Sequence, residues 1–209
     1  MTATPREAQL WNDRYSGTDL VWSSAPNRWV VEVCASLPPG QALDIAAGEG
    51  RHAIWLADRG WHVTATDFAS AAVARLRQQA RQRLGSEAAA RIQAAVADAT
   101  APAPGGPYDL TLLCYLQLPL DRWQIVLQRA VEATKVGGRI LVVLHARENL
   151  MCGFGGPQDA DLLHDPASVR RSVVGLPVRV ERAELVSRAV DTDEGPRQAL
   201  DSLVVLRRT

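Results

Sequence analysis

The sequence predicts an α/β fold in which helices cover a mostly parallel sheet. Apolar segments of strand length alternate along the chain with segments of helical periodicity. The first strand segment runs into a glycine-rich turn at the start of a helix, and acidic residues stand near the ends of three successive strands. The 209 residues suit one domain, and 47% hydrophobic residues are enough for a substantial core.

Residues 41–52 are predicted to form a strand, a tight turn and the beginning of a helix. Asp44 lies near the carboxyl end of the strand, and Gly48 and Gly50 follow in the turn. Glycine has no Cβ, so a ligand can approach the main chain where the helix begins. A glycine turn that only connects a strand to a helix would have the same sequence pattern. The neighbouring strands are therefore needed to distinguish a ligand site from a structural turn.

The next two strands also end in acids. Residues 61–67 end in Asp67, where an open α/β sheet places a carboxylate against a ribose diol. Residues 92–97 are followed by Asp98. Each Asp alone could cap a helix or form a turn. Three acids at three successive strand ends favour a nucleoside site.

The glycine spacing distinguishes two cofactor classes. A dinucleotide site requires G-x-G-x-x-G, whereas this chain has Asp44-x-Ala46-x-Gly48-x-Gly50 and carries Ala53 in place of the third glycine. An acid before alternating small residues suits a cofactor with an amino-acid tail, whose ammonium group binds a carboxylate. The motif resembles the first motif of the class I S-adenosylmethionine-dependent methyltransferases, from which it departs at Ala46, where the family often has glycine.

This resemblance implies a Rossmann-like, doubly wound seven-stranded sheet with an antiparallel last strand, in a single domain. Residues 41–209 would form the methyltransferase core and residues 1–40 an N-terminal helical cap of the same domain. The implied activity is methyl transfer from S-adenosyl-L-methionine to a small-molecule acceptor: a thiol, a chalcogen oxyanion or a natural-product nucleophile. Two alternatives stay open, a non-catalytic S-adenosylmethionine-binding protein and, less favoured, an NAD(P)-dependent oxidoreductase.

Helices are predicted over residues 7–15 and 26–37, before the first strand. Pro26 fits the first turn of the second helix. Trp29, inside that helix, is expected to pack in the core.

Residues 11–15 (WNDRY) and 20–22 (LVW) resemble the tellurite-resistance and thiopurine branch of the family. That resemblance implies that the cap closes over the cofactor, with Arg14 and Trp22 covering the site. For Trp22, packing onto the sheet is an equally good interpretation.

Helices are next predicted over residues 51–59 and 70–84. Arg51 stands in a first turn, where the helix dipole disfavours a cation, which favours a contact with the cofactor carboxylate over simple solvation. Phe68 is placed either against a purine ring or on the following helix. The resemblance implies that Asp98 accepts from the adenine amine. The candidate cofactor-binding residues are Trp22, Asp44, Ala46, Gly48, Gly50, Arg51, Asp67, Phe68, Asp98, Ala99, Cys114 and Tyr115.

The fourth strand, residues 108–115, is almost uniformly apolar, as expected of a parallel strand covered on both faces. Cys114 and Tyr115 at its end would pass the methionine half of the cofactor. No Asn/Asp-Pro-Pro-aromatic box follows them, which argues against methylation of bases or protein amides. A helix over residues 121–134 leads to a fifth strand, 140–145, which ends in His145.

The three candidate catalytic residues are His145 as a proton acceptor, Tyr115 and Arg188. Arg188 lies in a predicted hairpin of strands 178–190 and 199–207, with a bulge near Arg182. The tellurite branch has a His-Arg pair in this hairpin, and only Arg188 matches it, which leaves oxyanion handling in doubt.

Residues 149–165 are predicted to form an irregular loop that could act as a lid, followed by a short helix over residues 166–173. Asp159, Asp161 and His164 in the loop could hold a metal, but a turn-rich surface loop is the better interpretation, so no metal is predicted.

Composition limits the partners. The formal net charge is +0, so no nucleic-acid partner is expected. No apolar segment is long enough to span a bilayer, and residues 1–6 lack the apolar core of a secretory signal, so a cytoplasmic protein without a membrane partner is expected. The three cysteines, Cys34, Cys114 and Cys152, suggest neither disulfides nor a zinc site. The sequence indicates no oligomeric state.

Overall fold

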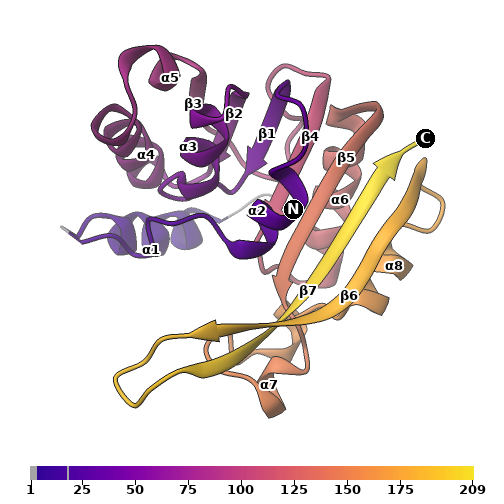
Figure 1. The fold of residues 1–209 in the computed structure, drawn as a ribbon. Helices are drawn as coiled ribbons and strands as arrows, with labels where there is room; N and C mark the ends of the chain where they lie inside the picture. The colour runs from indigo at the N-terminus through magenta and orange to yellow at the C-terminus, as the bar shows by residue number, and fades with distance from the viewer. Residues whose placement is uncertain (1–3, 18) are drawn as a thin grey trace.

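The computed structural model describes residues 4–17 and 19–209. A single seven-stranded sheet runs through its centre (Figure 1). In spatial order its strands are β3 (Ile92–Val96), β2 (His62–Asp67), β1 (Gln41–Ile45), β4 (Tyr108–Cys114), β5 (Thr134–His145), β7 (Arg197–Arg208) and β6 (Val178–Val190). Strands β1 to β5 pair in parallel, and β7 runs antiparallel to both of its neighbours. The predicted doubly wound sheet with an antiparallel last strand is confirmed.

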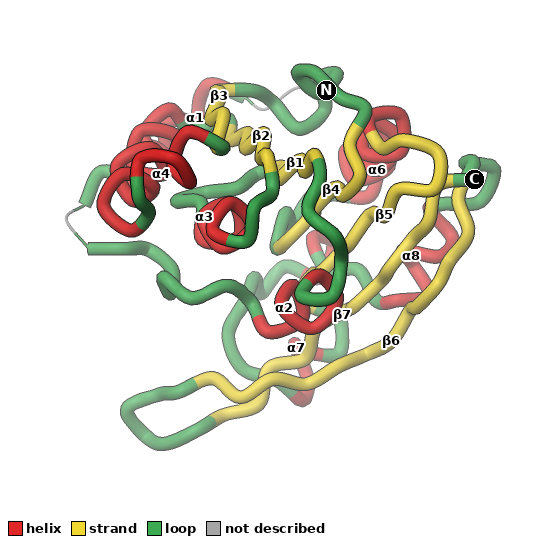
Figure 2. Tube along the Cα trace, turned by 45° about the horizontal axis from the view of Figure 1, so that its top comes forward, coloured by secondary structure: helices red, strands yellow, loops and turns green. Residues whose placement is uncertain are grey.

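Helices cover both faces of the sheet, as the tube view shows (Figure 2). One face packs against α2 (Arg28–Cys34), α3 (Arg51–Asp58) and α4 (Ser70–Arg83). The other packs against α6 (Leu120–Ala133) and α8 (Pro166–Ser172). The first helix, α1 (Pro5–Tyr15), lies outside this layer and packs on α4 through Tyr15 and Ala72. Shorter helices are α5 (Ser86–Ala90), α7 (Asn149–Cys152) and a 3-10 turn at Ala160–Leu162.

The strand period of two divides the core between the two faces. Along β4, Leu112 faces the α3 side and Leu113 the α6 side, and both are fully buried. Burying a side chain of this size contributes about 1.5–3 kcal/mol. The same alternation carries Asp44 of β1 to the α3 side, into the apolar layer.

Some element boundaries differ from those predicted. Strand β5 begins at Thr134, six residues before the predicted start at 140, because Thr134 pairs with Tyr108 and its hydroxyl bonds that of Thr111 at 2.7 Å. Two glycines that follow Thr134 are poor strand formers and hid this extension. The alanine-rich α5 was not predicted. The predicted bulge in the hairpin is confirmed by a register shift between Val180 and Arg182.

Candidate functional site

The turn after β1 uses three left-handed residues. Ala46, Gly48 and Gly50 have φ values of 58°, 55° and 86°. A Cβ on Gly50 would lie 2.3 Å from Cγ of Leu76 in α4, so glycine is required there by packing as well as by φ. Ala46 adopts a conformation that costs an L-residue about 1–2 kcal/mol. Its departure from glycine therefore costs backbone strain and not only an added methyl group.

Asp67 joins this turn to the start of α4. Its Oδ2 accepts from the N–H of Gly48 and its Oδ1 from the N–H of Ala69, each at 2.9 Å. The residue is only 5% exposed, and burial raises the pKa of its carboxyl group, with the backbone donors opposing that rise. Asp67 thus holds the turn in shape; its predicted contact with a ribose remains a prediction.

Asp44 lies beneath the same turn and is 1% exposed. The backbone N–H of Ala53 in α3 donates to its carboxylate. Its Oδ2 atom is buried without a hydrogen-bond partner among the described residues. Burial raises the pKa of Asp44 to about 7, and the neighbouring Arg51 opposes the rise. A buried acid with one unsatisfied oxygen is costly, and an added cationic donor would relieve it.

The predicted adenine end is less distinctive. Oδ1 of Asp98 accepts from the backbone N–H of Thr100 at 2.8 Å and from its hydroxyl at 2.6 Å, which is a turn of the kind that an Asp forms without a ligand. Phe68 and Ala99 are half-buried. The adenine contacts predicted for these residues are not tested by this geometry.

Residues 19–24, which we call the strap, cross over the glycine turn. Oε2 of Glu49 accepts from the N–H groups of Val21 at 3.0 Å and Trp22 at 3.2 Å. Glu49 is itself buried and paired with Arg75 of α4 at 3.0 Å. Arg75 also donates to the carbonyl oxygens of Tyr15, Gly17 and Asp19. One ion pair therefore fastens the strap to both the turn and α4.

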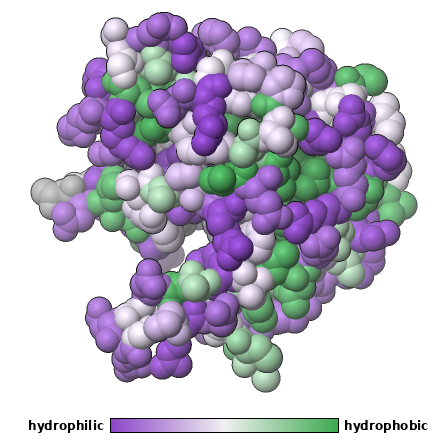
Figure 3. Space-filling view, in the orientation of Figure 1, coloured by the Kyte–Doolittle hydropathy of each residue, from purple (hydrophilic) through white to green (hydrophobic). Residues whose placement is uncertain are grey.

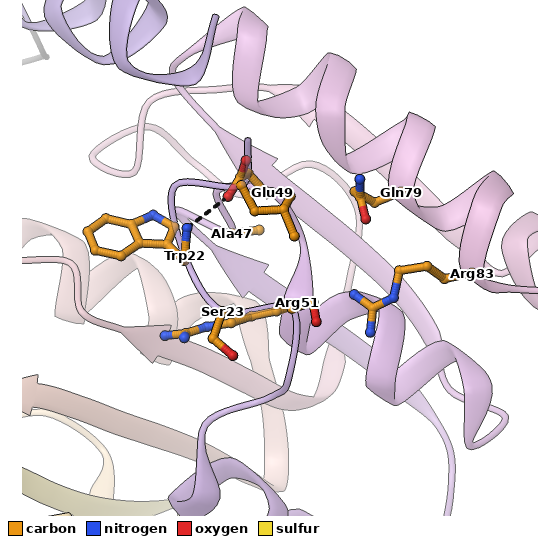
Figure 4. A pocket seen from close by; sticks show the side chains of 9 residues that line it. Trp22, Ser23, Ala47, Glu49, Arg51, Gln79 and Arg83 are labelled. Carbon is orange, nitrogen blue, oxygen red and sulfur yellow. Dashed lines mark hydrogen bonds between the residues drawn. The ribbon is translucent and has the colours of Figure 1, made fainter. Parts of the chain in front are cut away.

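Trp22 lies over the turn and is 41% exposed. Its Nε1 donates to the hydroxyl of Tyr15 at 3.2 Å, and the guanidinium of Arg14 lies 4.8 Å from the centre of its ring. Beneath the strap is a cavity of about 30 Å³, the size of one water molecule. Figure 4 shows its lining: Trp22, Ser23, Ala47, Glu49, Arg51, Gln79 and Arg83.

A second polar cluster lies at the ends of β4, β5 and the hairpin, and sequence reasoning missed its centre, Asp201. This residue is fully buried and faces His145 across the β5–β7 pair. Its Oδ2 accepts from the Tyr115 hydroxyl and from Nε of Arg188, both at 2.8 Å. Asn27, the N-cap of α2, donates to the Tyr115 hydroxyl at 2.7 Å. The three candidate catalytic residues thus converge on Asp201.

Two atoms of this cluster face each other without a hydrogen bond. Oδ1 of Asp201 and Nδ1 of His145 are 3.6 Å apart, and both are buried with no hydrogen-bond partner among the described residues. Burial lowers the pKa of His145, Arg188 lowers it further, and Asp201 opposes both. Burial and Asp201 raise the pKa of the Tyr115 hydroxyl well above its usual value. His145 is therefore a neutral imidazole at pH 7 and Tyr115 a neutral phenol.

The segment after β5 packs against this cluster. Asn149 donates to the carbonyl of Gly155 at 2.7 Å and accepts from the N–H of Leu200 at 2.7 Å. Gly156 lies against the His145 ring, where a Cβ would come within 2.9 Å of Cγ. In this structure the predicted lid is tied to β7.

The predicted metal alternative in this loop finds no support in the geometry. Oδ1 of Asp159 accepts from the N–H of Asp161, and Nε2 of His164 bonds the carbonyl of Leu118 at 2.8 Å. Within residues 4–17 and 19–209, no group of three His, Cys, Asp or Glu side chains could hold a metal ion. In the same part of the chain no helix is both long and apolar enough to cross a membrane.

A sequence signal existed for one of the two missed residues, Asp201, and not for the other, Asn27. Asp201 and Ser202 interrupt the otherwise apolar strand from 199 to 206, and an acid in a buried strand is expected to have a specific partner. Asn27 precedes a helix, where capping explains it, so nothing in the sequence pointed to its second bond.

Comparison with known proteins supports the sequence analysis. Residues 42–138 match a protein family described as a methyltransferase domain. One curated relative, a probable non-canonical nonribosomal peptide synthetase (CymA) of Salinispora arenicola, is 38% identical over 87 residues, which is 41% of this chain and 1% of that far longer protein.

Solved structures share the fold of almost the whole chain. One, which concerns the conversion of a disulfide bond into a thioacetal group during echinomycin biosynthesis, has a TM-score of 0.74 at 20% identity, covering 96% of this chain and 92% of that one. The glycopeptide N-methyltransferase MtfA, complexed with S-adenosylmethionine, has a TM-score of 0.69 at 17% identity, covering 99% and 98%. TehB from Haemophilus influenzae has 0.68 at 19%, covering 97% and 67%.

These findings confirm the predicted resemblance to the S-adenosylmethionine-dependent methyltransferases. The predicted cofactor is the one present in the MtfA complex.

Proposed function

Proceeding from the match of residues 42–138 to a methyltransferase domain, we propose that this protein transfers a methyl group from S-adenosylmethionine to a small, peptide-derived natural product. One observation carries the cofactor assignment: the unsatisfied, buried Oδ2 of Asp44 beneath a left-handed turn. A cofactor ammonium group would satisfy this oxygen. A pyrophosphate, as in a dinucleotide, would be repelled by it.

The residues at the sheet edge fit the rest of the cofactor. We assign Asp67 to the ribose, Phe68, Asp98 and Ala99 to the adenine, and Arg51 to the carboxylate of the amino-acid tail. Cys114 and Tyr115 end the strand that lies between the glycine turn and His145. Bound S-adenosylmethionine supplies a methyl group on a sulfonium, which is activated enough for positioning and exclusion of water to be the main tasks of the protein.

We propose that the acceptor binds on the side of Asp201. In the space-filling view the molecular surface is hollowed between the N-terminal part of the chain and the hairpin formed by β6 and β7 (Figure 3). Two of the similar proteins have peptide products in their names, a glycopeptide N-methyltransferase and a probable nonribosomal peptide synthetase, and a third structure concerns a step of echinomycin biosynthesis. This agreement supports a peptide-derived acceptor over a tellurium or selenium oxyanion, for which Arg188 alone matches the expected pair.

Calorimetry tests the cofactor assignment. We expect S-adenosylmethionine and S-adenosylhomocysteine to bind the purified protein with micromolar affinity and NAD to give no heat. Replacing Asp67 by Asn should weaken binding at least 10-fold, whereas Asp109→Asn should not. Asp109 is the matched control because it lies near the amino end of β4, the opposite edge of the sheet. Circular dichroism checks that each variant is folded.

Two results would overturn the proposal. If neither S-adenosyl compound binds, the cofactor is wrong. If both bind but no methylated product forms with any peptide, thiol, hydroxyl or amine acceptor in a mass-spectrometric screen, the protein is the non-catalytic S-adenosylmethionine-binding protein that the sequence left open.

A further inference from the structure

The two oxygens of the Asp201 carboxylate differ in their hydrogen bonds. Oδ2 is used by Tyr115 and Arg188, at 2.8 Å each. Oδ1 faces Nδ1 of His145 and has no hydrogen bond of its own. A carboxylate oxygen can only accept a hydrogen bond. Nδ1 of His145 can therefore donate to Oδ1 of Asp201 when it carries the ring proton and the ring moves by a few tenths of an ångström.

We propose that Asp201 is a positioning residue that holds His145 in the Nδ1–H tautomer, so that Nε2 is the proton acceptor for a methyl acceptor that carries a proton on its nucleophilic atom. This inference rests on the proposed function and narrows its substrate class. It covers thiols, hydroxyl groups and amines, and it excludes thioethers and halides as natural acceptors, because these have no proton to remove.

The surroundings of His145 favour it over Tyr115 for this role. The Tyr115 hydroxyl donates to Asp201 and accepts from Asn27 and Arg188, so its lone pairs and its proton are already used. Among the described residues, the His145 imidazole faces one polar group, Oδ1 of Asp201, and 14% of its side chain is exposed. Tyr115 and Arg188 then act by holding Asp201 in place.

The groups around the His145 ring come from several elements, and two of them, Asp201 and Arg188, carry charge. Asp201 comes from β7, Arg188 from β6, Tyr115 from the end of β4 and Gly156 from the segment after β5, while Oε1 of Gln117 accepts from the His145 backbone N–H at 2.9 Å. Asp201 favours the imidazolium, and Arg188 disfavours it. A buried acid behind a histidine is the arrangement that stabilises an imidazolium formed during proton transfer.

The reaction step balances without a further reagent. A lone pair of the acceptor atom forms the bond to the methyl carbon, and the electron pair of the broken carbon–sulfur bond stays on sulfur. The proton of the acceptor atom passes to Nε2 of His145, and the resulting imidazolium then releases it to solvent.

Asp201→Asn is the central test. With a protic acceptor we expect kcat to fall about 100-fold or more, in the range of general-base effects, while KM for S-adenosylmethionine changes less than 3-fold. The acid limb of the kcat/KM profile should move to lower pH, because loss of the carboxylate lowers the pKa of His145. The control Asp191→Asn, at an exposed acid of the same hairpin, should leave both unchanged. An unchanged acid limb with unchanged kcat in Asp201→Asn would overturn the inference.

The tautomer itself is measurable without activity. Long-range ¹H–¹⁵N spectra of the wild-type protein should show His145 protonated at Nδ1, assigned by the signal lost in His145→Gln. This measurement decides the question even if Asp201→Asn fails to fold. A wild-type spectrum with the Nε2–H tautomer would overturn the inference and leave the methyltransferase proposal intact.

Three probes test the substrate class. In His145→Gln, methylation of 2-mercaptoethanol and phenol should fall about 100-fold relative to the wild type, while methylation of dimethyl sulfide should change less than 3-fold. Equal losses for all three probes would mean that His145 is structural. Absence of S-adenosylmethionine binding, by contrast, would refute the proposed function and not the tautomer.

Discussion

Gly50 illustrates how one residue meets two demands. Its φ of 86° and the 2.3 Å approach of a Cβ to Leu76 both exclude a side chain. We expect Gly50→Ala to lower the free energy of unfolding by about 3 kcal/mol or more, the sum of left-handed strain and overpacking. Gly175→Ala is the matched control, because Gly175 has φ +85° but open space around it, and it should cost only about 1–2 kcal/mol. Urea unfolding measures the free energy of unfolding of both variants. Equal losses would show that α4 shifts to make room for the added methyl group.

Asp44 is expected to couple cofactor binding to the release of a proton. Its pKa of about 7 in the free protein lies above the value of 3.8 for a free side chain, so the folded protein binds the extra proton and loses stability as pH rises through about 7. An ammonium group beside it favours the carboxylate. We therefore expect S-adenosylmethionine binding at pH 6.5 to release a proton, seen as a binding enthalpy that varies with the ionisation enthalpy of the buffer.

The matched variant for this prediction is Asp44→Asn, which has no proton to release. Its binding enthalpy should be the same in every buffer, and Asp109→Asn should behave as the wild type does. Proton uptake instead of release by the wild type would show that the ammonium group does not approach Asp44.

At the scale of elements, the strap and α4 are joined by the buried pair of Glu49 and Arg75. We expect Glu49→Ala to destabilise the protein by about 3 kcal/mol, since Arg75 keeps its charge and loses its carboxylate. Limited proteolysis should then cleave residues 19–24 faster. Glu87→Ala breaks an exposed pair with Arg91 and should cost less than about 0.5 kcal/mol. Resistance of the strap to protease in Glu49→Ala would show that Trp22 and Tyr15 suffice to hold it.

The cavity beneath the strap also bears on cofactor entry. Its volume of about 30 Å³ is far too small for S-adenosylmethionine. If the cofactor binds beside the glycine turn as proposed, the strap moves when the cofactor enters, and we expect Glu49→Ala to bind it faster in stopped-flow measurements. A slower association in this variant would contradict the closed strap.

Across the whole molecule, stability is expected to be highest where both faces of the sheet are covered. Hydrogen exchange should be slowest in β4 and in residues 140–144 of β5, where the side chains are almost all buried. Among the strands it should be fastest at the hairpin end near residues 188–198. Added S-adenosylmethionine should slow exchange in the glycine turn and leave the hairpin end unchanged. Mass spectrometry of deuterated peptides measures this, and uniform protection would indicate a different binding site.

Local patterns in the chain were sufficient for much of this architecture. The apolar run of β4, the helical stripe of α4 and the glycines after β1 each specify their structure through neighbours a few residues away, so the parallel core was predictable. The resemblance to the methyltransferases then supplied the strand order. Contacts of Asp67 and Asp98 with a cofactor were inferred from position and remain predictions.

The sequence by itself determined the fold class and the sheet edge at which the chemistry is placed, because apolar periodicity and turn residues act locally. Only the tertiary structure decided which side chains meet. Asp201 faces His145 because β7 is antiparallel and pairs in one register, and Glu49 meets the strap because α1 packs on α4. Such contacts join residues 28 to 56 positions apart in the chain, and nothing in the spacing of residues along one strand reports the register of another.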